Sequence, residues 1–203
     1  MRRLGIDALL ASPAALRETV EELRQGAVLA VPTESSYGLA VDPRSARGVE
    51  RILQLKGRDA GKALLVLVAR RVQLDGLGVT APPETLDRFE ALWPAPLTVV
   101  LSLAAPLPAS CGAATLAVRI PAHARLRNLL ATTGPLTATS LNRSGQAPCV
   151  DPDEAARLFE GEVDLLVDGG AMPGGQPSTL VDATVDPPRV LRAGAFPWPP
   201  ATR

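Results

Sequence analysis

The chain has 203 residues, of which 46% are hydrophobic and 21% are charged, and its 21 basic side chains balance 21 acidic ones. This composition predicts a soluble globular protein, and the zero net charge argues against a general affinity for polyanions. No apolar run approaches the roughly 20 residues that a membrane span needs. Asp7, Pro13 and Glu18 interrupt the N-terminal segment too early for a signal peptide, so we expect a cytoplasmic protein.

Helical patterns recur along the chain. Ser12 is expected to cap a helix that runs towards Gly26, and Ser45 or Asp42 is expected to cap a second helix that ends at Lys56. Acidic residues and a proline after Asp151 predict a third helix start. Two further helices are expected over residues 82–93 and 125–131.

Short apolar runs between these helices predict strands. They cover residues 27–31, 63–68, 97–103, 115–120, 136–140, 163–167, 179–183 and 189–191. Helices and strands alternate without a repeat or a linker, so we expect one α/β (α+β) domain over residues 1–203, built on a mixed sheet flanked by helices. Its core is expected over about residues 16–196, with an extended C-terminal tail over residues 197–203.

Cysteine and histidine are scarce. Cys111 and Cys149 are the only cysteines, and they show neither CxxC spacing nor a set of nearby histidines, so two free thiols are expected rather than a disulfide. His123 is the only histidine and lies where a helix is expected to start. We therefore set aside an ordinary zinc site and a Ser-His-Asp hydrolase, and we predict no metal ligands from the protein.

A basic window stands out between residues 44 and 71. It holds eight lysines and arginines against two acids, Glu50 and Asp59, so this window is +6 and the remainder is −6. A basic island in a neutral chain indicates a local anionic ligand, although a solvated basic turn is the default alternative. A phosphate-binding loop is excluded, because three residues rather than four separate Gly57 from Gly61 and alanine follows Lys62.

Polar residues also gather where strands end. Ser140 and Asn142 follow an apolar strand, and Arg192 ends another beside a glycine. Arg119 lies within an apolar strand and needs an anionic partner, either an internal carboxylate or the carboxylate of a ligand. A glycine-rich loop over residues 168–179 re-enters a strand and allows close approach of its backbone to a ligand. Together these features favour a nucleotide plus a small carboxylate.

Several short motifs follow one another in a fixed order. They are Pro32-Thr33-Glu34, Tyr37-Gly38-Leu39, Lys56-Gly57-Arg58, Trp93-Pro94-x-Pro96-Leu97-Thr98, Ala117-Val118-Arg119-Ile120-Pro121, Ser140-x-Asn142, Ser178-Thr179 and Leu191-Arg192-x-Gly194. In this combination the chain resembles the YrdC-like threonylcarbamoyl-AMP synthase family, in its short single-domain form. The resemblance implies a twisted mixed sheet with a basic groove on its concave face.

The resemblance also implies an activity. L-Threonine, bicarbonate and ATP would yield threonylcarbamoyl-AMP and pyrophosphate, with Mg2+ bound to ATP, and a tRNA threonylcarbamoyl transferase complex would pass the group to adenosine 37 of tRNA. Direct tRNA binding would be weak. The ATP site would comprise Lys56, Arg58, Lys62, Ser140, Asn142 and Arg192, with Lys56 and Arg58 as the catalytic residues. The threonine site would comprise Thr33, Arg119, Ser178 and Thr179.

Two alternatives and one departure from the family pattern accompany this interpretation. The same groove could bind RNA without catalysis, as in a tRNA or ribosome maturation factor, but few aromatic residues and no net charge support that. A carbamoyl-transferring module of hydrogenase maturation is the other alternative. Leu141 stands where the family usually has alanine, and its larger side chain is expected to narrow the nucleotide crevice.

Overall fold

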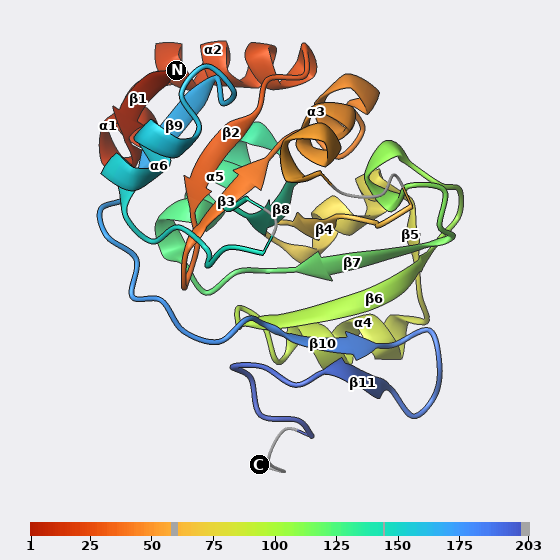
Figure 1. The fold of residues 1–203 in the computed structure, drawn as a ribbon. Helices are drawn as coiled ribbons and strands as arrows, with labels where there is room; N and C mark the ends of the chain where they lie inside the picture. The colour runs from red at the N-terminus through yellow and green to blue at the C-terminus, as the bar shows by residue number, and fades with distance from the viewer. Residues whose placement is uncertain (58–60, 144, 200–203) are drawn as a thin grey trace.

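A mixed sheet of eleven strands organises the described part of the chain, which comprises residues 1–57, 61–143 and 145–199 of a computed structural model (Figure 1). The strands are β1 (Arg2–Gly5), β2 (Leu29–Pro32), β3 (Tyr37–Ala40), β4 (Leu65–Leu67), β5 (Val79–Thr80), β6 (Leu97–Leu103), β7 (Thr115–Arg119), β8 (Leu136–Ser140), β9 (Leu165–Asp168), β10 (Thr179–Asp182) and β11 (Arg189–Arg192). Their order across the sheet is β1-β9-β2-β3-β8-β4-β7-β6-β10-β11, and β5 pairs with β6.

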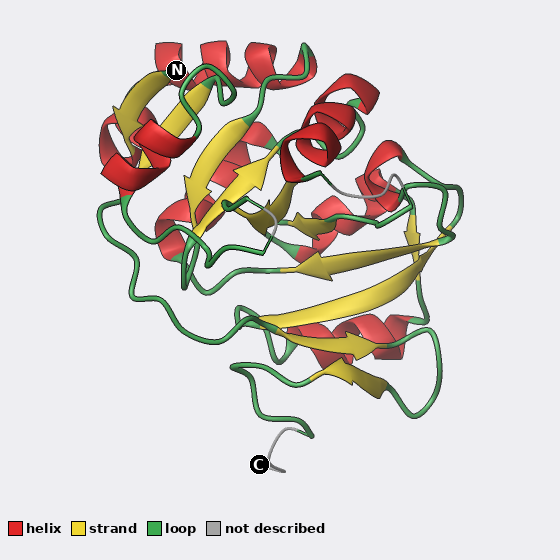
Figure 2. Cartoon of the chain, in the orientation of Figure 1, coloured by secondary structure: helices red, strands yellow, loops and turns green. Residues whose placement is uncertain are grey.

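Helices flank this twisted sheet, as Figure 2 shows. They are α1 (Ile6–Ala11), α2 (Pro13–Arg24), α3 (Ala46–Lys56), α4 (Pro83–Glu90), α5 (Ala124–Thr133) and α6 (Pro152–Leu158), with short 3-10 helices η1 (Arg71–Leu77) and η2 (Pro108–Ser110). The sheet is mixed, because β4 runs parallel to β7 but antiparallel to β8. The predicted fold class is thereby confirmed.

Side-chain caps set the predicted helix starts. The Ser12 hydroxyl accepts a hydrogen bond from the Ala15 amide at 3.2 Å, and the Ser45 hydroxyl accepts one from the Gly48 amide at the same distance. Asp151 caps α6 in the same way, through two amides of the first turn. Each cap satisfies amides that the helix leaves without partners. Of the two alternatives for α3, Ser45 is therefore the cap.

Two apolar clusters cover opposite sides of the central strands. One packs β-strand side chains against α1, α2 and α5, with Ile6, Leu9 and Leu126 almost fully buried. The other includes Ile52 of α3 and Phe89 of α4, both without exposed surface. Strands covered on both faces have no polar side, which is why continuous apolar runs predicted them. Among the described residues no helix is long and apolar enough to cross a membrane.

Several elements were not predicted, notably β1, α1, β3 and η1. β1 carries two arginines and lies at the edge of the sheet, where it pairs with β9 from the far end of the chain. Arg3 is held there by Asp168, whose carboxylate accepts hydrogen bonds from its Nε at 2.9 Å and from its Nη2 at 2.7 Å. A partner so distant in sequence leaves no local signal.

Candidate active site

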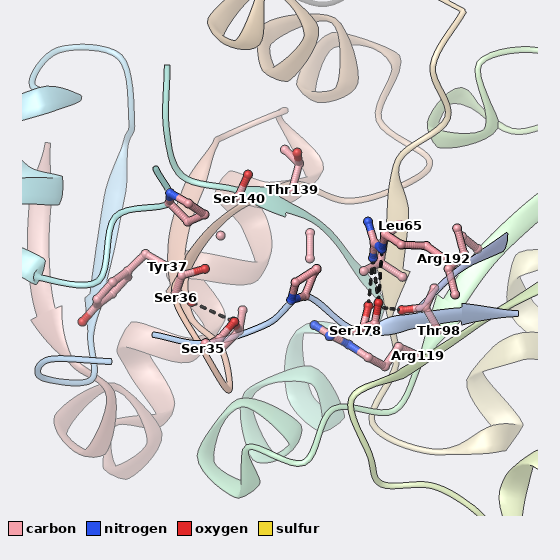
Figure 3. A pocket seen from close by; sticks show the side chains of 18 of the residues that line it. Ser35, Ser36, Tyr37, Leu65, Thr98, Arg119, Thr139, Ser140, Ser178 and Arg192 are labelled. Atoms are coloured by element: carbon pink, nitrogen blue, oxygen red, sulfur yellow. Dashed lines mark hydrogen bonds between the residues drawn. The ribbon is translucent and has the colours of Figure 1, made fainter. Parts of the chain in front are cut away.

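A cavity of about 620 Å³ lies against the sheet between the β2–β3 turn and the ends of β8, β10 and β11 (Figure 3). It is lined by Thr33, Ser35, Ser36, Tyr37, Gly38, Ala63, Leu65, Thr98, Ala117, Arg119, Ala138, Thr139, Ser140, Pro148, Val150, Gly174, Gly175, Pro177, Ser178, Leu180 and Arg192. Five of the ten residues predicted for the site therefore line this one cavity: Thr33, Arg119, Ser140, Ser178 and Arg192.

One end of the cavity is rich in hydroxyl groups. Figure 3 places Ser35, Ser36, Thr139 and Ser140 together at this end, which we call the hydroxyl end. The turn that carries the first two is closed by Thr33, whose hydroxyl donates to the Ser36 carbonyl at 2.7 Å. Hydroxyls can donate to phosphate oxygens and accept from sugar hydroxyls, so this end suits a nucleotide.

Tyr37 fixes the glycine-rich loop beside this end. Its hydroxyl donates to the Gly170 carbonyl at 2.8 Å and accepts from the Gly169 amide at 3.0 Å. Burial raises the pKa of Tyr37 to about 12, so the hydroxyl keeps its proton and both hydrogen bonds at neutral pH. The same loop brings the backbone of Gly174 and Gly175 to the cavity wall, as the glycine pattern predicted.

Lys56 connects this end to helix α3. The side chain is 5% exposed, and its ammonium donates to the Ser140 carbonyl at 2.7 Å and the Asn142 carbonyl at 2.9 Å. It also donates to the side-chain oxygen of Asn142, which accepts from the Ser140 hydroxyl at 2.6 Å. The predicted Lys56, Ser140 and Asn142 therefore form one cluster, which reaches the cavity through Ser140.

The opposite end holds two arginines, and we call it the arginine end. Figure 3 shows Arg119, Arg192, Ser178 and Thr98 grouped there. The Arg192 guanidinium donates to the Ser178 carbonyl at 2.9 Å, and the hydroxyls of Ser178 and Thr98 are hydrogen-bonded at 2.8 Å. Two guanidinium groups facing one cavity repel each other, so an anion between them is favoured.

Arg119 has an internal partner that satisfies it only in part. It ends β7 rather than lying in the middle of the strand, its side chain is 9% exposed, and Nη2 lies 3.4 Å from Glu34 Oε2. Among the described residues, Arg119 Nε and Glu34 Oε2 are buried without a hydrogen-bond partner. The pKa of Arg119 is lowered from its ordinary value, mainly because the side chain is buried. The Glu34 carboxylate opposes this shift, and the nearby Arg192 cation adds to it. Of the two anions left open by the sequence, the internal one is present, yet the buried Nε–H of Arg119 has no partner among the described residues.

The remaining predicted residues lie elsewhere. The Thr179 hydroxyl donates to the Phe196 carbonyl at 2.6 Å, and this side chain is not on the cavity wall. Lys62 is exposed and also off the wall, although the next residue, Ala63, lines it. Arg58 lies outside the described residues. Leu141 is fully buried in the core and does not line the cavity, so the expected narrowing is absent.

Three arginines of the basic window have partners within the protein. Arg51 pairs with Asp164 at 2.6 Å, Arg71 pairs with Glu90 at 2.9 Å, and Arg44 donates to the Gly76 carbonyl. Among the described residues, the cations on the cavity wall are Arg119 and Arg192, from outside the window. Three of the window's eight cations are thus engaged within the protein, and Lys56 contacts the Ser140 cluster, whereas Arg58 lies outside the described residues. The sequence did not identify Thr98 and Thr139 as residues of the cavity wall. Alternate side chains of a strand share a face, but this pattern does not show which face borders a cavity.

Comparisons with known proteins agree with this geometry. The Sua5/YciO/YrdC family model, described as telomere recombination, matches residues 21–194. A protein of Thiobacillus denitrificans named threonylcarbamoyl-AMP synthase is 38% identical over 174 residues, which cover 84% of this chain and 91% of that protein. The structure of Escherichia coli YciO matches with a TM-score of 0.76 at 25% identity, over 92% of each chain.

A longer relative also matches. The crystal structure of Pyrococcus abyssi Sua5 complexed with L-threonine has a TM-score of 0.83 at 32% identity. The match covers 97% of this chain, and the chain spans 57% of the length of the Pyrococcus protein. With a family model matched over most of its length and a relative matched almost end to end, the chain belongs to the Sua5/YciO/YrdC family.

Proposed function

We propose that this chain is an L-threonylcarbamoyladenylate synthase, a nucleotidyltransferase that forms threonylcarbamoyl-AMP and pyrophosphate from L-threonine, bicarbonate and ATP. The observation that carries the proposal is a hydroxyl-lined cavity with two guanidinium groups, Arg119 and Arg192, at one end. The names of the relatives support this interpretation over RNA binding without catalysis. They also support a place in tRNA modification.

The hydroxyl end would hold the nucleotide. Ser140 and Asn142, tied together by Lys56, would contact the nucleotide, and Arg58 and Lys62 would extend the phosphate contacts. Arg192 lies at the far end of the same cavity. The family motif implies that it would contact the nucleotide from this far side. Fixed cations suit this reaction, because they offset the charge of ATP as it approaches a second anion.

The arginine end would hold L-threonine. The Arg119 guanidinium, whose Nε–H has no partner among the described residues, would face the carboxylate, and Thr33 and Ser178 also line the cavity. Glu34 is not on the cavity wall, and the described wall residues include no carboxylate. A positive wall without a carboxylate favours an anionic, N-carboxylated amino acid over one that carries an ammonium group.

The reaction balances in two steps without a protein nucleophile. The uncharged amine of threonine attacks the carbon of bicarbonate, a C–N bond forms and water leaves, which gives a carbamate. A carbamate oxygen then attacks the α-phosphorus of ATP, and pyrophosphate leaves with the electrons of the broken P–O bond. In this scheme the chain's own residues bind, orient and stabilise charge, with Lys56 and Arg58 in the catalytic positions.

Mg2+ is proposed to arrive with ATP. Among the described residues no group of three or more His, Cys, Asp and Glu side chains lies together, whereas the wall offers hydroxyl oxygens such as those of Ser35, Ser36 and Ser140. Such a donor set suits an ion that keeps most of its ligands from phosphates and water. Bound Mg2+ would supply charge neutralisation of the phosphates, as a Lewis acid.

Downstream, we propose that a tRNA threonylcarbamoyl transferase complex accepts the product and modifies adenosine 37 of tRNA. The adenylate is a mixed anhydride, so a second enzyme with a bound acceptor must consume it. Zero net charge and 3% aromatic residues offer little support for tight RNA binding by this chain itself. tRNA affinity is accordingly expected to be weak and steeply dependent on salt.

Pyrophosphate release separates the synthase from the RNA-binding alternative. ATP-dependent release is expected to require L-threonine and bicarbonate together and to need no RNA, because both co-substrates contribute atoms to the nucleophile. The measurement is a coupled pyrophosphate assay in which each component is omitted in turn. Release that appears only after tRNA is added would contradict the proposal.

A further inference from the structure

The C-terminal residues fold back across the start of β10. The Ala195 amide donates to the Pro177 carbonyl at 2.9 Å. The Thr179 hydroxyl donates to the Phe196 carbonyl at 2.6 Å and accepts from the Phe196 amide at 3.1 Å. These residues, 193–198, are called the tail strap. These hydrogen bonds lie at the end of the predicted core, just before the predicted tail over residues 197–203.

A glycine permits the close contact at the near end of the tail strap. A Cβ atom on Gly194 would lie 2.2 Å from the Pro177 carbonyl oxygen and 2.6 Å from the backbone of Ser178 and Thr179. Atoms cannot approach so closely, and all three neighbours are backbone atoms that cannot rotate away. Any other residue at position 194 must lift the tail strap or displace the segment beneath it.

The far end of the tail strap is anchored on α4. The Trp198 ring stacks on the buried Phe89 ring, with centroids 5.9 Å apart and planes 15° apart. The Arg88 guanidinium carbon lies 5.6 Å from the centre of the same Trp198 ring. Aromatic stacking and cation–π contacts both favour this placement. The tail strap is thus held at two separated points, by β10 and by α4.

The tail strap lies against the segment that forms part of the arginine end of the cavity. Pro177 and Ser178 line the cavity, whereas the next side chain, Thr179, bonds to the tail strap. Arg192 immediately precedes the tail strap and donates to the Ser178 carbonyl through Nη2 at 2.9 Å and Nε at 3.3 Å. Ser178 and Arg192 are therefore hydrogen-bonded to each other, and each is a chain neighbour of a residue that belongs to the tail strap or bonds to it.

We propose that the tail strap positions Ser178 and Arg192 for anion binding, so that Thr179, Gly194 and Trp198 are positioning residues of this cavity. The inference rests on the proposed function only in taking L-threonine as the probe. It gives Thr179 a role through Phe196 instead of the direct substrate contact that the family motif implies. A small displacement of a fixed donor weakens every interaction that depends on its direction.

The first test removes the hydroxyl of Thr179 without changing the shape of the side chain. Thr179→Val is expected to weaken L-threonine binding about tenfold in calorimetry, whereas ATP binding, which would lose only the Arg192 contact and keep those of the hydroxyl end, changes less. Thr179→Ser keeps the hydroxyl and is expected to restore wild-type affinity. Val185→Ala is the matched control, because Val185 is exposed in the neighbouring hairpin loop. Equal affinity in Thr179→Val and wild type would overturn the proposal.

A double-mutant cycle separates positioning from direct contact. Trp198→Ala loosens the far anchor, and if Thr179 acts through the tail strap, Thr179→Val should add little to its effect on L-threonine affinity. Trp198→Phe keeps a ring over Phe89 and is expected to retain most of the affinity. Fully additive losses in the double variant would show that Thr179 touches the substrate directly and would overturn its positioning role.

Hydrogen exchange in the free protein tests the tail strap independently of any substrate. Thr179→Val is expected to speed exchange at the amides of Ala195 and Phe196. The Phe196 amide loses its acceptor, and the neighbouring Ala195 amide is then held less firmly against the Pro177 carbonyl. Unchanged exchange would refute the tail strap even if the wild type is a synthase. Faster exchange in a protein whose wild type does not bind L-threonine would instead refute the proposed function and leave the tail strap intact.

Discussion

Replacing Arg119 by lysine is expected to raise the KM for L-threonine at least about tenfold, or about 1.4 kcal/mol. Lysine keeps a positive charge beside Glu34 but loses the planar guanidinium, whose Nε–H has no partner within the described residues. The KM for ATP should change less, because the nucleotide contacts are proposed for the other end of the cavity. Threonine and ATP titrations of the same variant provide the measurement.

Because Arg119 pairs with Glu34, the choice of substitution can separate a structural role of Arg119 from a role in binding. Arg119→Ala would leave the Glu34 carboxylate buried without a cation and should cost about 3–5 kcal/mol of folding free energy. Lysine should cost much less, since it retains that cation. Arg127→Lys is the matched control, because Arg127 bonds the Pro121 carbonyl and does not line the cavity. A large drop in melting temperature with an unchanged threonine KM in Arg119→Lys would make Arg119 purely structural.

Replacing Lys56 by methionine is expected to weaken ATP binding at least about tenfold. The ammonium holds two carbonyls and one amide oxygen at the end of β8, and its loss removes this donor from all three, although the amide oxygen keeps the Ser140 hydroxyl. Losing such a charge-assisted contact costs about 1.5–3 kcal/mol. Ser140 and Asn142 would then no longer be held in the arrangement proposed for the nucleotide.

Calorimetric ATP titration measures this effect, and a melting curve accounts for stability. Arg47→Met is the control, because it removes an exposed cation from the same helix without touching the β8 end. The control should bind ATP like the wild type. A folded Lys56→Met variant with wild-type ATP affinity would exclude Lys56 from the nucleotide site.

Much of the fold was predictable because its signals are local. The caps Ser12, Ser45 and Asp151 mark helix starts by their own chemistry, and β6 and β8 have the predicted bounds because turn residues delimit their apolar runs. β1 was not predictable in this way, since its two arginines become strand residues only by pairing with β9. Long-range pairing leaves no pattern in the segment itself.

The site was predictable in its residue types and less so in their directions. Ser178 and Thr179 are neighbours in one motif, yet successive side chains of an extended segment point to opposite faces, so one lines the cavity and the other bonds the tail. In the same way, Thr33 lines the cavity, whereas the next residue, Glu34, does not line it and pairs with Arg119. Counting charges in the basic window could not show that Arg51 is paired with Asp164 and that Arg71 is paired with Asp87 and Glu90.

The central claim is that this cavity joins bicarbonate carbon, L-threonine and the AMP part of ATP in one molecule. Incubating the wild-type protein with carbon-labelled bicarbonate, ATP and each amino acid in turn tests it most directly, with chromatographic detection of labelled adenylate. The account predicts a labelled adenylate with L-threonine and without RNA, and a strongly reduced yield from Arg119→Lys. Pyrophosphate release without label in any adenylate, or equal labelling with every amino acid, would contradict it.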